Sequence, residues 1–274
     1  MNSWLAALLT LAAPAAPPAS DLALWRLDCG TIVVKDYNAF FSDTFAYPPG
    51  KAKELTVSCY LIRNGGRYFL WDTGIAASFV TEPVDNEVQS VRLGSTIPDQ
   101  LRSIAVDPAQ IERIGVSHYH ADHTEQAASF PHAKLLIGAA DLAALKDGQP
   151  HFGVDPVTLA HWTSGKGEVQ GVEGNHDVFG DGRVVMLSLP GHTPGHYALL
   201  VRLAGGPVLL GGDVYHFAEQ VPHRGVPPFN WNRADSLAAM DRFDRIAKNL
   251  NAKVIIQHEP GDIAKLPAFP EAAR

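Results

Sequence analysis

The feature that most constrains the fold of this 274-residue chain is an apolar run that ends in a histidine or an aspartate, which occurs four times. The four runs lead to His118, His192, Asp213 and His258. Short apolar runs bounded by turn signals are typical of buried β-strands. In α/β sheets, ligands bind beyond the carboxyl ends of the strands. We therefore expect one α/β domain whose strands bring these side chains to a common edge.

The remaining segments predict further elements of the same domain. Strands are expected at 22–34, in a hairpin at 55–74 and at the start of 133–148, and helices at 95–106, at the end of 133–148 and at 233–250. Asn64-Gly65-Gly66 supplies the hairpin turn, and Ser95 or Thr96 is the candidate N-cap of the first helix. Between residues 151 and 182 the apolar periodicity fades, so we expect a long loop there.

The stretch "SHYHADHTEQ" at 117–126 concentrates possible metal ligands: His118, His120, Asp122 and His123. Imidazole and carboxylate suit zinc, and also manganese, iron or cobalt. The lack of cysteine thiolates in this stretch argues against a structural zinc finger. A solvated, histidine-rich loop is the alternative, but an H-x-H-x-D-H pattern rarely arises by chance. We interpret the stretch as part of a metal site.

This pattern resembles the H-x-H-x-D-H signature of the metallo-β-lactamase superfamily. The superfamily's other ligands have counterparts in the expected order: His192 in "LPGHTPGH", Asp213 in "LLGGDVYH" and His258 in "VIIQHEP". Asp72 in "FLWDTG" matches an aspartate that supports the metal ligands in that family. The resemblance implies an αββα sandwich, two sheets face to face with helices outside, over residues 21–274 as one hydrolase domain.

The same resemblance implies how the ligands are shared between two divalent metal ions, with zinc as the expected metal. One ion would be held by His118, His120 and His192, and the other by Asp122, His123 and His258, with Asp213 bridging the two. Two such ions lower the pKa of water toward neutrality and polarise a substrate oxygen. Asp122 would then carry a proton to the leaving alkoxide.

Among the branches of this superfamily, the chain is most similar to the N-acyl homoserine lactonases, which open a lactone ring. His120 disfavours the di-iron flavoprotein branch, which resembles H-x-E-x-D-H, and Asp213 disfavours the zinc β-lactamases. The alternative is a periplasmic zinc β-lactamase or a promiscuous esterase or lactonase of the same fold. A binding protein with a damaged site is disfavoured because all seven expected ligands are present.

The group that would assist the substrate carbonyl is open between two residues. Lactonases of this branch have a tyrosine three residues after the bridging aspartate, where this chain has His216, with Tyr215 one position earlier. Neighbouring side chains of an extended segment point to opposite sides, so only one of the two can face the site. We prefer His216 by position.

An apolar pocket is expected for the acyl chain of the substrate. The candidates are aromatic residues in segments of low periodicity, although each of them could equally close the core under a loop. They are Phe40, Phe41, Phe45, Phe152, Trp162, Phe229 and Trp231. His196 is expected to order the loop of His192 rather than to bind metal. The remaining histidines are expected at the surface or in loops: His132, His151, His161, His176 and His223.

The net charge and the N-terminus bear on partners and location. A net charge of −7 and the absence of any Lys/Arg run argue against nucleic acid. Residues 1–20 resemble a signal peptide, although no Lys or Arg precedes the apolar run, and a disordered leader is the alternative. We expect a periplasmic or secreted protein with no membrane insertion after processing. The oligomeric state is open, with a homodimer as one alternative.

The two cysteines, Cys29 and Cys59, both lie in predicted strands. In an exported protein they could form a disulfide if the strands are neighbours. Two small buried side chains are the alternative.

Overall fold

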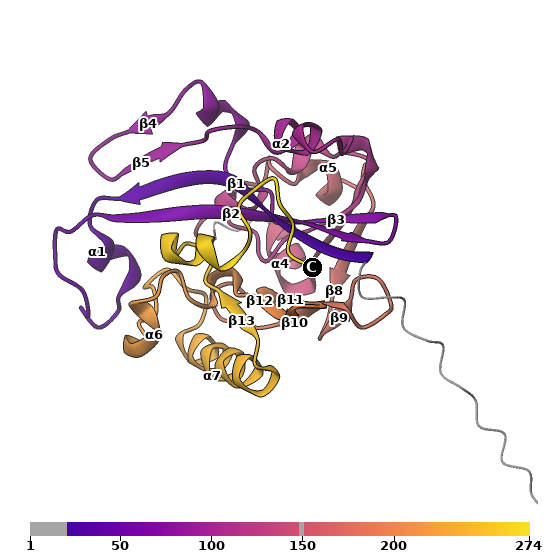
Figure 1. The fold of residues 1–274 in the computed structure, drawn as a ribbon. Coiled ribbons are helices and arrows are strands. Elements are labelled where there is room, and N and C mark those ends of the chain that lie inside the picture. Colours follow the sequence, from indigo (N-terminus) through magenta and orange to yellow (C-terminus); the bar gives the residue numbers. More distant parts are fainter. Residues whose placement is uncertain (1–20, 148–150) are drawn as a thin grey trace, which may run out of the picture.

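The first of two sheets is built around a long antiparallel hairpin near the start of the described chain (Figure 1). This computed structural model describes residues 21–147 and 151–274. In spatial order the strands are β4 (Val84–Asp85), β5 (Gln89–Arg92), β1 (Leu22–Val34), β2 (Lys53–Asn64), β3 (Arg67–Trp71), β6 (Ile111–Gly115), β7 (Lys134–Gly138) and β8 (Val169–Val172). Pairing is antiparallel up to β3 and parallel from β3 to β8.

The second sheet comes from the C-terminal half of the chain. Its spatial order is β13 (Lys253–Ile255), β12 (Gly206–Leu210), β11 (Tyr197–Leu203), β10 (Val184–Ser188) and β9 (His176–Asp177). The strands are antiparallel except for the β12–β13 pair, which is parallel. The helix α7 joins β12 to β13 and covers the outer face of this sheet (Figure 1).

Short helices occupy the connections. The α-helices are α1 (Tyr37–Phe41), α2 (Ile97–Ser103), α3 (Ala121–Thr124), α4 (Ala139–Lys146), α5 (Ala160–Thr163), α6 (Gln220–His223) and α7 (Arg233–Leu250), and the 3-10 turns are η2 (Ala77–Val80), η3 (Pro108–Gln110), η4 (Ala127–Ser129), η5 (Gly212–Val214) and η6 (Pro260–Lys265). None of the described helices has the length and apolar character needed to cross a membrane.

Three layers of apolar side chains hold the sandwich together. Between the sheets, Phe69 and Trp71 of the first sheet share a buried cluster with Met186 and Leu199 of the second. A second cluster lies on the outer face of the first sheet, under α2 and α5, and a third lies under α7. Each sheet thus buries both faces, as an αββα sandwich requires. The predicted fold class is confirmed.

The long helix α7 agrees with its prediction residue for residue. The Asn232 side chain accepts a hydrogen bond from the Asp235 N–H, which caps the helix start, and Asn251 ends the helix in the left-handed region. Helix α2 begins after the Thr96 cap as expected, but it ends at Ser103 rather than at 106.

The expectation of a long loop at 151–182 is wrong in part. This segment contains α5, β8 and β9, and β8 extends the first sheet by pairing with β7. The sequence of β8 predicts a loop because Gln170 and Gly171 interrupt the apolar pattern that is typical of a strand. An edge strand tolerates such residues since only one of its sides is paired.

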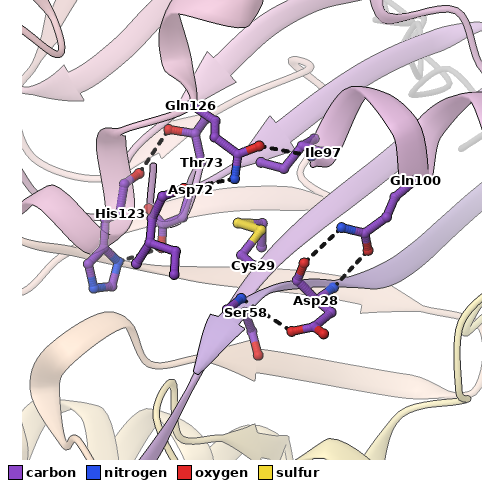
Figure 2. Close-up of a disulfide and its surroundings, with 12 residues drawn as sticks. Asp28, Cys29, Ser58, Asp72, Thr73, Ile97, Gln100, His123 and Gln126 are labelled. Atoms are coloured by element: carbon purple, nitrogen blue, oxygen red, sulfur yellow. Dashed lines mark hydrogen bonds and ion pairs between the residues drawn. A yellow bond between two sulfur atoms is a disulfide. The ribbon is translucent and has the colours of Figure 1, made fainter. Parts of the chain in front are cut away.

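Cys29 and Cys59 form a disulfide between β1 and β2 (Figure 2). The two strands are direct neighbours, and Leu27 is the register partner of Cys59. A register shift between Asp28 and Thr31 lies beside Cys29. The backbone next to the disulfide is held by Gln100 of α2, which accepts from the Asp28 N–H at 2.9 Å and donates to the Asp28 carbonyl at 2.7 Å. Of the two alternatives for the cysteines, the disulfide is therefore the correct one.

Candidate active site

Four loops at one edge of the sandwich carry the predicted ligands. His118 follows β6, His192 follows β10, Asp213 lies in η5 after β12, and His258 follows β13. Carboxyl ends of strands from both sheets meet at this edge. The expectation of a common edge is thus correct.

The predicted ligands fall into two groups. His118, His120, His192 and Asp213 offer ligand atoms that all lie within 4.8 Å of one another, and so do Asp122, His123 and His258. All seven are residues of the predicted set. The division between the groups is the one that the sequence resemblance implied.

The carboxylate of Asp213 lies between the two groups and approaches histidines of both, with Oδ2 also 3.4 Å from His258 Nε2. Its Oδ2 is 3.4 Å from His192 Nε2 and 3.8 Å from His118 Nε2. Its Oδ1 is 3.5 Å from His123 Nε2 and 3.1 Å from His258 Nε2. A carboxylate in this position is able to bridge two cations.

The site satisfies a direct test for metal binding. His118 Nε2, His123 Nε2 and Asp213 Oδ1 are buried, and none of them makes a hydrogen bond of acceptable geometry with the described residues, although His258 Nε2 approaches Oδ1 to 3.1 Å. Buried polar atoms are rarely left unpaired, and each such atom needs an explanation. All three point into the space that the two groups surround. Divalent cations would satisfy all three, so the residues fit two metal ions.

Burial sets the charge state of the first histidine group. It lowers the pKa of His118 and His192 well below the usual value and that of His120 to about 4. These imidazoles are therefore neutral at pH 7 and keep the lone pair that a metal requires.

Carboxylates dominate the second group. Burial lowers the pKa of His123 and His258, but Asp213 and Asp122 outweigh it and raise both values. Burial opposes ionisation of Asp213, yet His258 and His123 hold its pKa well below the usual range.

Hydrogen bonds behind the ligands fix the orientation of their rings. His123 Nδ1 lies 3.0 Å from Asp72 Oδ2 (Figure 2), and Asp72 Oδ1 accepts from the Ser117 N–H at 2.6 Å. His258 Nδ1 donates to the Thr56 carbonyl at 2.8 Å. Such partners leave Nε2 of each ring to face the centre. The prediction that Asp72 supports the metal ligands is confirmed, since it contacts His123.

Two further groups that hold metal-ligand histidines in place were not predicted from the sequence. The Asn230 side chain lies 2.9 Å from His192 Nδ1, and the Thr56 carbonyl binds His258. Thr56 precedes His258 by 202 residues. No local pattern signals a contact of that kind.

His196 orders the loop, as expected. Its Nδ1 donates to the Leu189 carbonyl at 3.1 Å, and its Nε2 accepts from the Asp213 N–H at 2.9 Å. Gly212 has a φ of 52°, and a Cβ there would lie 2.7 Å from His196 Nε2. Glycine is therefore required for the ring to reach the backbone of Asp213.

Tyr215 does not belong to the site, so its place among the catalytic candidates is wrong. Its hydroxyl donates to Asp244 Oδ2 at 3.0 Å, and its ring packs on Phe243 of α7. The backbone of Tyr215 is extended, with φ −132° and ψ 138°. Successive side chains of an extended segment face opposite sides. His216 therefore faces the metal ligands while Tyr215 faces the helix.

His216 lies directly against the centre. Its Nε2 is 3.3 Å from Asp213 Oδ2, and its ring centroid is 5.0 Å from that of His192. Gln220 of α6 accepts from the His216 N–H at 2.7 Å and lies 3.3 Å from its Nδ1. The other end of the Gln220 amide donates to the Gly225 carbonyl. This bond orients Oε1 toward His216.

A cavity of about 310 Å³ opens beside the metal ligands. Four of the seven predicted aromatic residues line it: Phe40, Phe41, Phe152 and Phe229. The rings of Phe152 and Phe229 stack with centroids 4.4 Å apart. The remaining three predictions are wrong. Trp162 is buried in the core with its Nε1 bonded to the Ala133 carbonyl, and Phe45 and Trp231 are exposed.

The five histidines predicted to lie outside the site are outside both ligand groups. His161 Nε2 bonds to the Pro131 carbonyl at 2.9 Å, and His151 pairs with Asp147 at 3.0 Å. His132 is exposed, His176 lies on the edge strand β9, and His223 ends α6.

This geometry and the sequence define the class of protein. Residues 52–258 match the profile of the metallo-beta-lactamase superfamily. The match includes all seven ligands and most of the chain. The chain belongs to this superfamily.

Within this superfamily, the chain is similar in sequence to several N-acyl homoserine lactonases. The N-acyl homoserine lactonase AttM of Rhizobium radiobacter is 25% identical over 275 residues, covering 92% of this chain and 98% of the relative. The N-acyl homoserine lactonase AiiA of Bacillus thuringiensis subsp. kurstaki is 24% identical over 239 residues, covering 82% and 90%.

Solved structures share the fold. An N-acyl homoserine lactone hydrolase with N-hexanoyl-L-homoserine bound at its catalytic metal center has a TM-score of 0.76 at 21% identity, covering 92% of this chain and 98% of that one. AidC, a dizinc quorum-quenching lactonase, has a TM-score of 0.67 at 16% identity, covering 92% and 90%.

Proposed function

We propose that this protein is a dinuclear metal hydrolase that opens the lactone ring of N-acyl homoserine lactones. The observation that carries the proposal is the position of Asp213, whose carboxylate approaches histidines of both ligand groups. The relatives AttM and AiiA are named for this activity, and the first of them covers nearly the whole chain.

Zinc is the metal that we propose for both positions. One ion would be held by His118, His120 and His192. The other would be held by Asp122, His123 and His258, and Asp213 would bind both ions. Neutral imidazoles and carboxylates without thiolates suit this metal in a catalytic site. When bound, two zinc ions supply a nucleophile at neutral pH by acidifying water, and Lewis acidity toward a carbonyl oxygen.

Two side chains of the protein would handle the substrate. His216 lies on the cavity wall beside Asp213, where it can donate a hydrogen bond to the lactone carbonyl. Asp122 also lines the cavity, and its side chain is 24% exposed against 4% for Asp213. Asp122 is therefore the carboxyl group that can pass a proton to the alkoxide of the opened ring.

The cavity supports a substrate with an apolar tail. Beyond the metal ligands its wall is mainly aliphatic and aromatic, and it includes Ile32, Val34 and Leu55 from the first sheet and the Phe152–Phe229 pair. Its volume is at the lower end of the range for small-ligand sites. We expect the lactone head to lie at His216 and the acyl chain to extend between these walls.

Purified protein reconstituted with zinc tests the proposal. We expect hydrolysis of acyl homoserine lactones with C6 to C12 chains to exceed that of simple esters and β-lactams in kcat/KM. The chelated protein should be inactive, and zinc analysis should give two equivalents per chain. Faster opening of a β-lactam ring would replace this function with that of a zinc β-lactamase, and faster cleavage of simple esters would indicate a promiscuous esterase.

We also propose that the protein is exported to the periplasm or the medium. The leader at 1–20 lies outside the described residues. The Cys29–Cys59 disulfide supports the proposal because such bonds persist in oxidising compartments. Cell fractionation with the full chain tests it, and exclusive recovery from the cytoplasm would contradict it. The homodimer stays a prediction that light scattering can check.

A further inference from the structure

A buried carboxylate outside both ligand groups links the loops that carry three of the ligands. Asp141, in the first turn of α4, is fully buried. Its Oδ2 accepts from the Thr193 hydroxyl at 2.8 Å and its Oδ1 from the Gly195 N–H at 2.6 Å. The backbone of Tyr119 also lies close to the same carboxylate and favours its charged form.

The two donors and the backbone of Tyr119 flank metal ligands on two separate loops. Tyr119 lies between His118 and His120, and Thr193 follows His192 directly. These loops are far apart in the sequence, since His120 and His192 are 72 residues apart. The carboxylate thus lies between the backbone that joins His118 to His120 and the backbone that follows His192, and it is not a member of either ligand group.

The backbone around Asp141 is closely packed against the loop that carries His192. A Cβ on Gly138 would overlap the Gly195 carbonyl, and a Cβ on Gly195 would overlap the backbone of Asp141. The start of α4 therefore packs directly against the backbone of the His192 loop. Burial raises the pKa of Asp141 to about 7 even though its hydrogen bonds act in the opposite direction. Its burial is unfavourable by itself, which argues for a specific role.

We propose that Asp141 is a positioning residue for the metal site formed by His118, His120 and His192. It acts by accepting hydrogen bonds from the loop after His192 and by its contact with the backbone of Tyr119 between His118 and His120. Partners behind a ligand shell commonly change metal affinity by about 10- to 100-fold. This inference rests on the metal assignment of the proposed function and not on the substrate.

Zinc titration of the metal-free protein against a competing chelator tests the role. Asp141→Asn replaces one acceptor oxygen with an N–H₂ group, so the Thr193 hydroxyl and the Gly195 N–H can both remain bonded only if the hydroxyl turns from donor to acceptor. We expect one of the two zinc equivalents to bind about 10-fold or more weakly, while the other keeps its affinity within about threefold. Thr193→Val removes one donor at nearly constant shape and should weaken the same equivalent less.

Asp177→Asn is the matched control. Asp177 also accepts backbone hydrogen bonds, from Phe179, Gly180 and Gly182, but it lies on β9 at the outer edge of the second sheet. We expect it to lower the Tm without changing either zinc affinity. The inference is overturned if Asp141→Asn binds both equivalents as the parent does, or if the two variants lose zinc alike in proportion to their Tm. A parent protein that binds no zinc would overturn the proposed function as well.

Discussion

At the residue scale, the site divides into side chains that local sequence identifies and side chains that only the fold identifies. The seven candidate ligands could be predicted to lie together because the H-x-H-x-D-H stretch places four of them within six positions, and the others end apolar strands. His216 and Tyr215 could not be separated in this way, because both are polar aromatic residues at neighbouring positions. The extended backbone at Tyr215 decides between them.

A pair of variants tests that assignment. His216→Phe keeps a ring beside Phe41, whose centroid is 4.8 Å away, but it removes the donor toward the substrate. We expect kcat to fall about 100-fold with zinc content unchanged, as for loss of a positioned proton or hydrogen-bond donor. Steady-state kinetics on an acyl homoserine lactone and metal analysis measure both.

Tyr215→Phe is the control. It removes only the hydrogen bond to Asp244, so it should cost about 1 kcal/mol of stability and leave kcat and KM unchanged. Unaltered kinetics in His216→Phe would remove His216 from the mechanism. A large loss of kcat in Tyr215→Phe would contradict its placement against α7.

At the scale of elements, prediction succeeded where local periodicity and turn chemistry are strong. Helix α7 has both a cap and an apolar stripe, and the β2–β3 hairpin has Gly65 at a φ of 62° in its turn. It was wrong at 151–182 because β8 is short and takes its strand conformation from its pairing with β7. Pairing between distant segments can override weak local preference.

The disulfide between β1 and β2 makes an element-scale prediction. The two cysteines are 30 residues apart, and closing a loop of that length restricts the unfolded chain by about 3.5 kcal/mol. We expect Cys29→Ala with Cys59→Ala to lower the free energy of unfolding by about 2–4 kcal/mol. Urea unfolding monitored by circular dichroism measures the change.

Zinc affinity is the internal control for this double variant. The disulfide belongs to the apolar cluster on the outer face of the first sheet, but Cys29 packs against Gly74, next to the Asp72-Thr73 backbone that supports His123 (Figure 2). The zinc equivalent at His118, His120 and His192 should therefore bind as in the parent protein. An unchanged stability would mean that the disulfide does not form in the purified protein.

At the scale of the whole molecule, the two sheets depend on each other at the edge that carries the site. One ligand group takes His118 and His120 from the first sheet and His192 and Asp213 from the second. His258 follows β13 of the second sheet and bonds to Thr56 on β2 of the first. Metal binding therefore joins the two halves of the sandwich and should stabilise the whole fold.

Metal removal tests this coupling. A ligand present at about 1,000 times its dissociation constant stabilises the folded state by about 4 kcal/mol. For a chain of this size we expect chelation to lower the Tm by roughly 10 °C. Differential scanning calorimetry with and without chelator measures the shift. Asp213→Asn should show a much smaller one, and an equal shift in that variant would contradict the bridging place of Asp213.

The amino-acid sequence by itself determined the ligand set, the class of fold and the strands that carry the ligands. It could do so because strand periodicity and the spacing of metal ligands are local patterns. Only the tertiary structure decided that His216 faces the site, that Cys29 and Cys59 pair, which aromatic residues line the cavity, and that Asp141 links the ligand loops. Each of these depends on contacts between residues far apart in the chain, whose distances are set by how the two sheets pack.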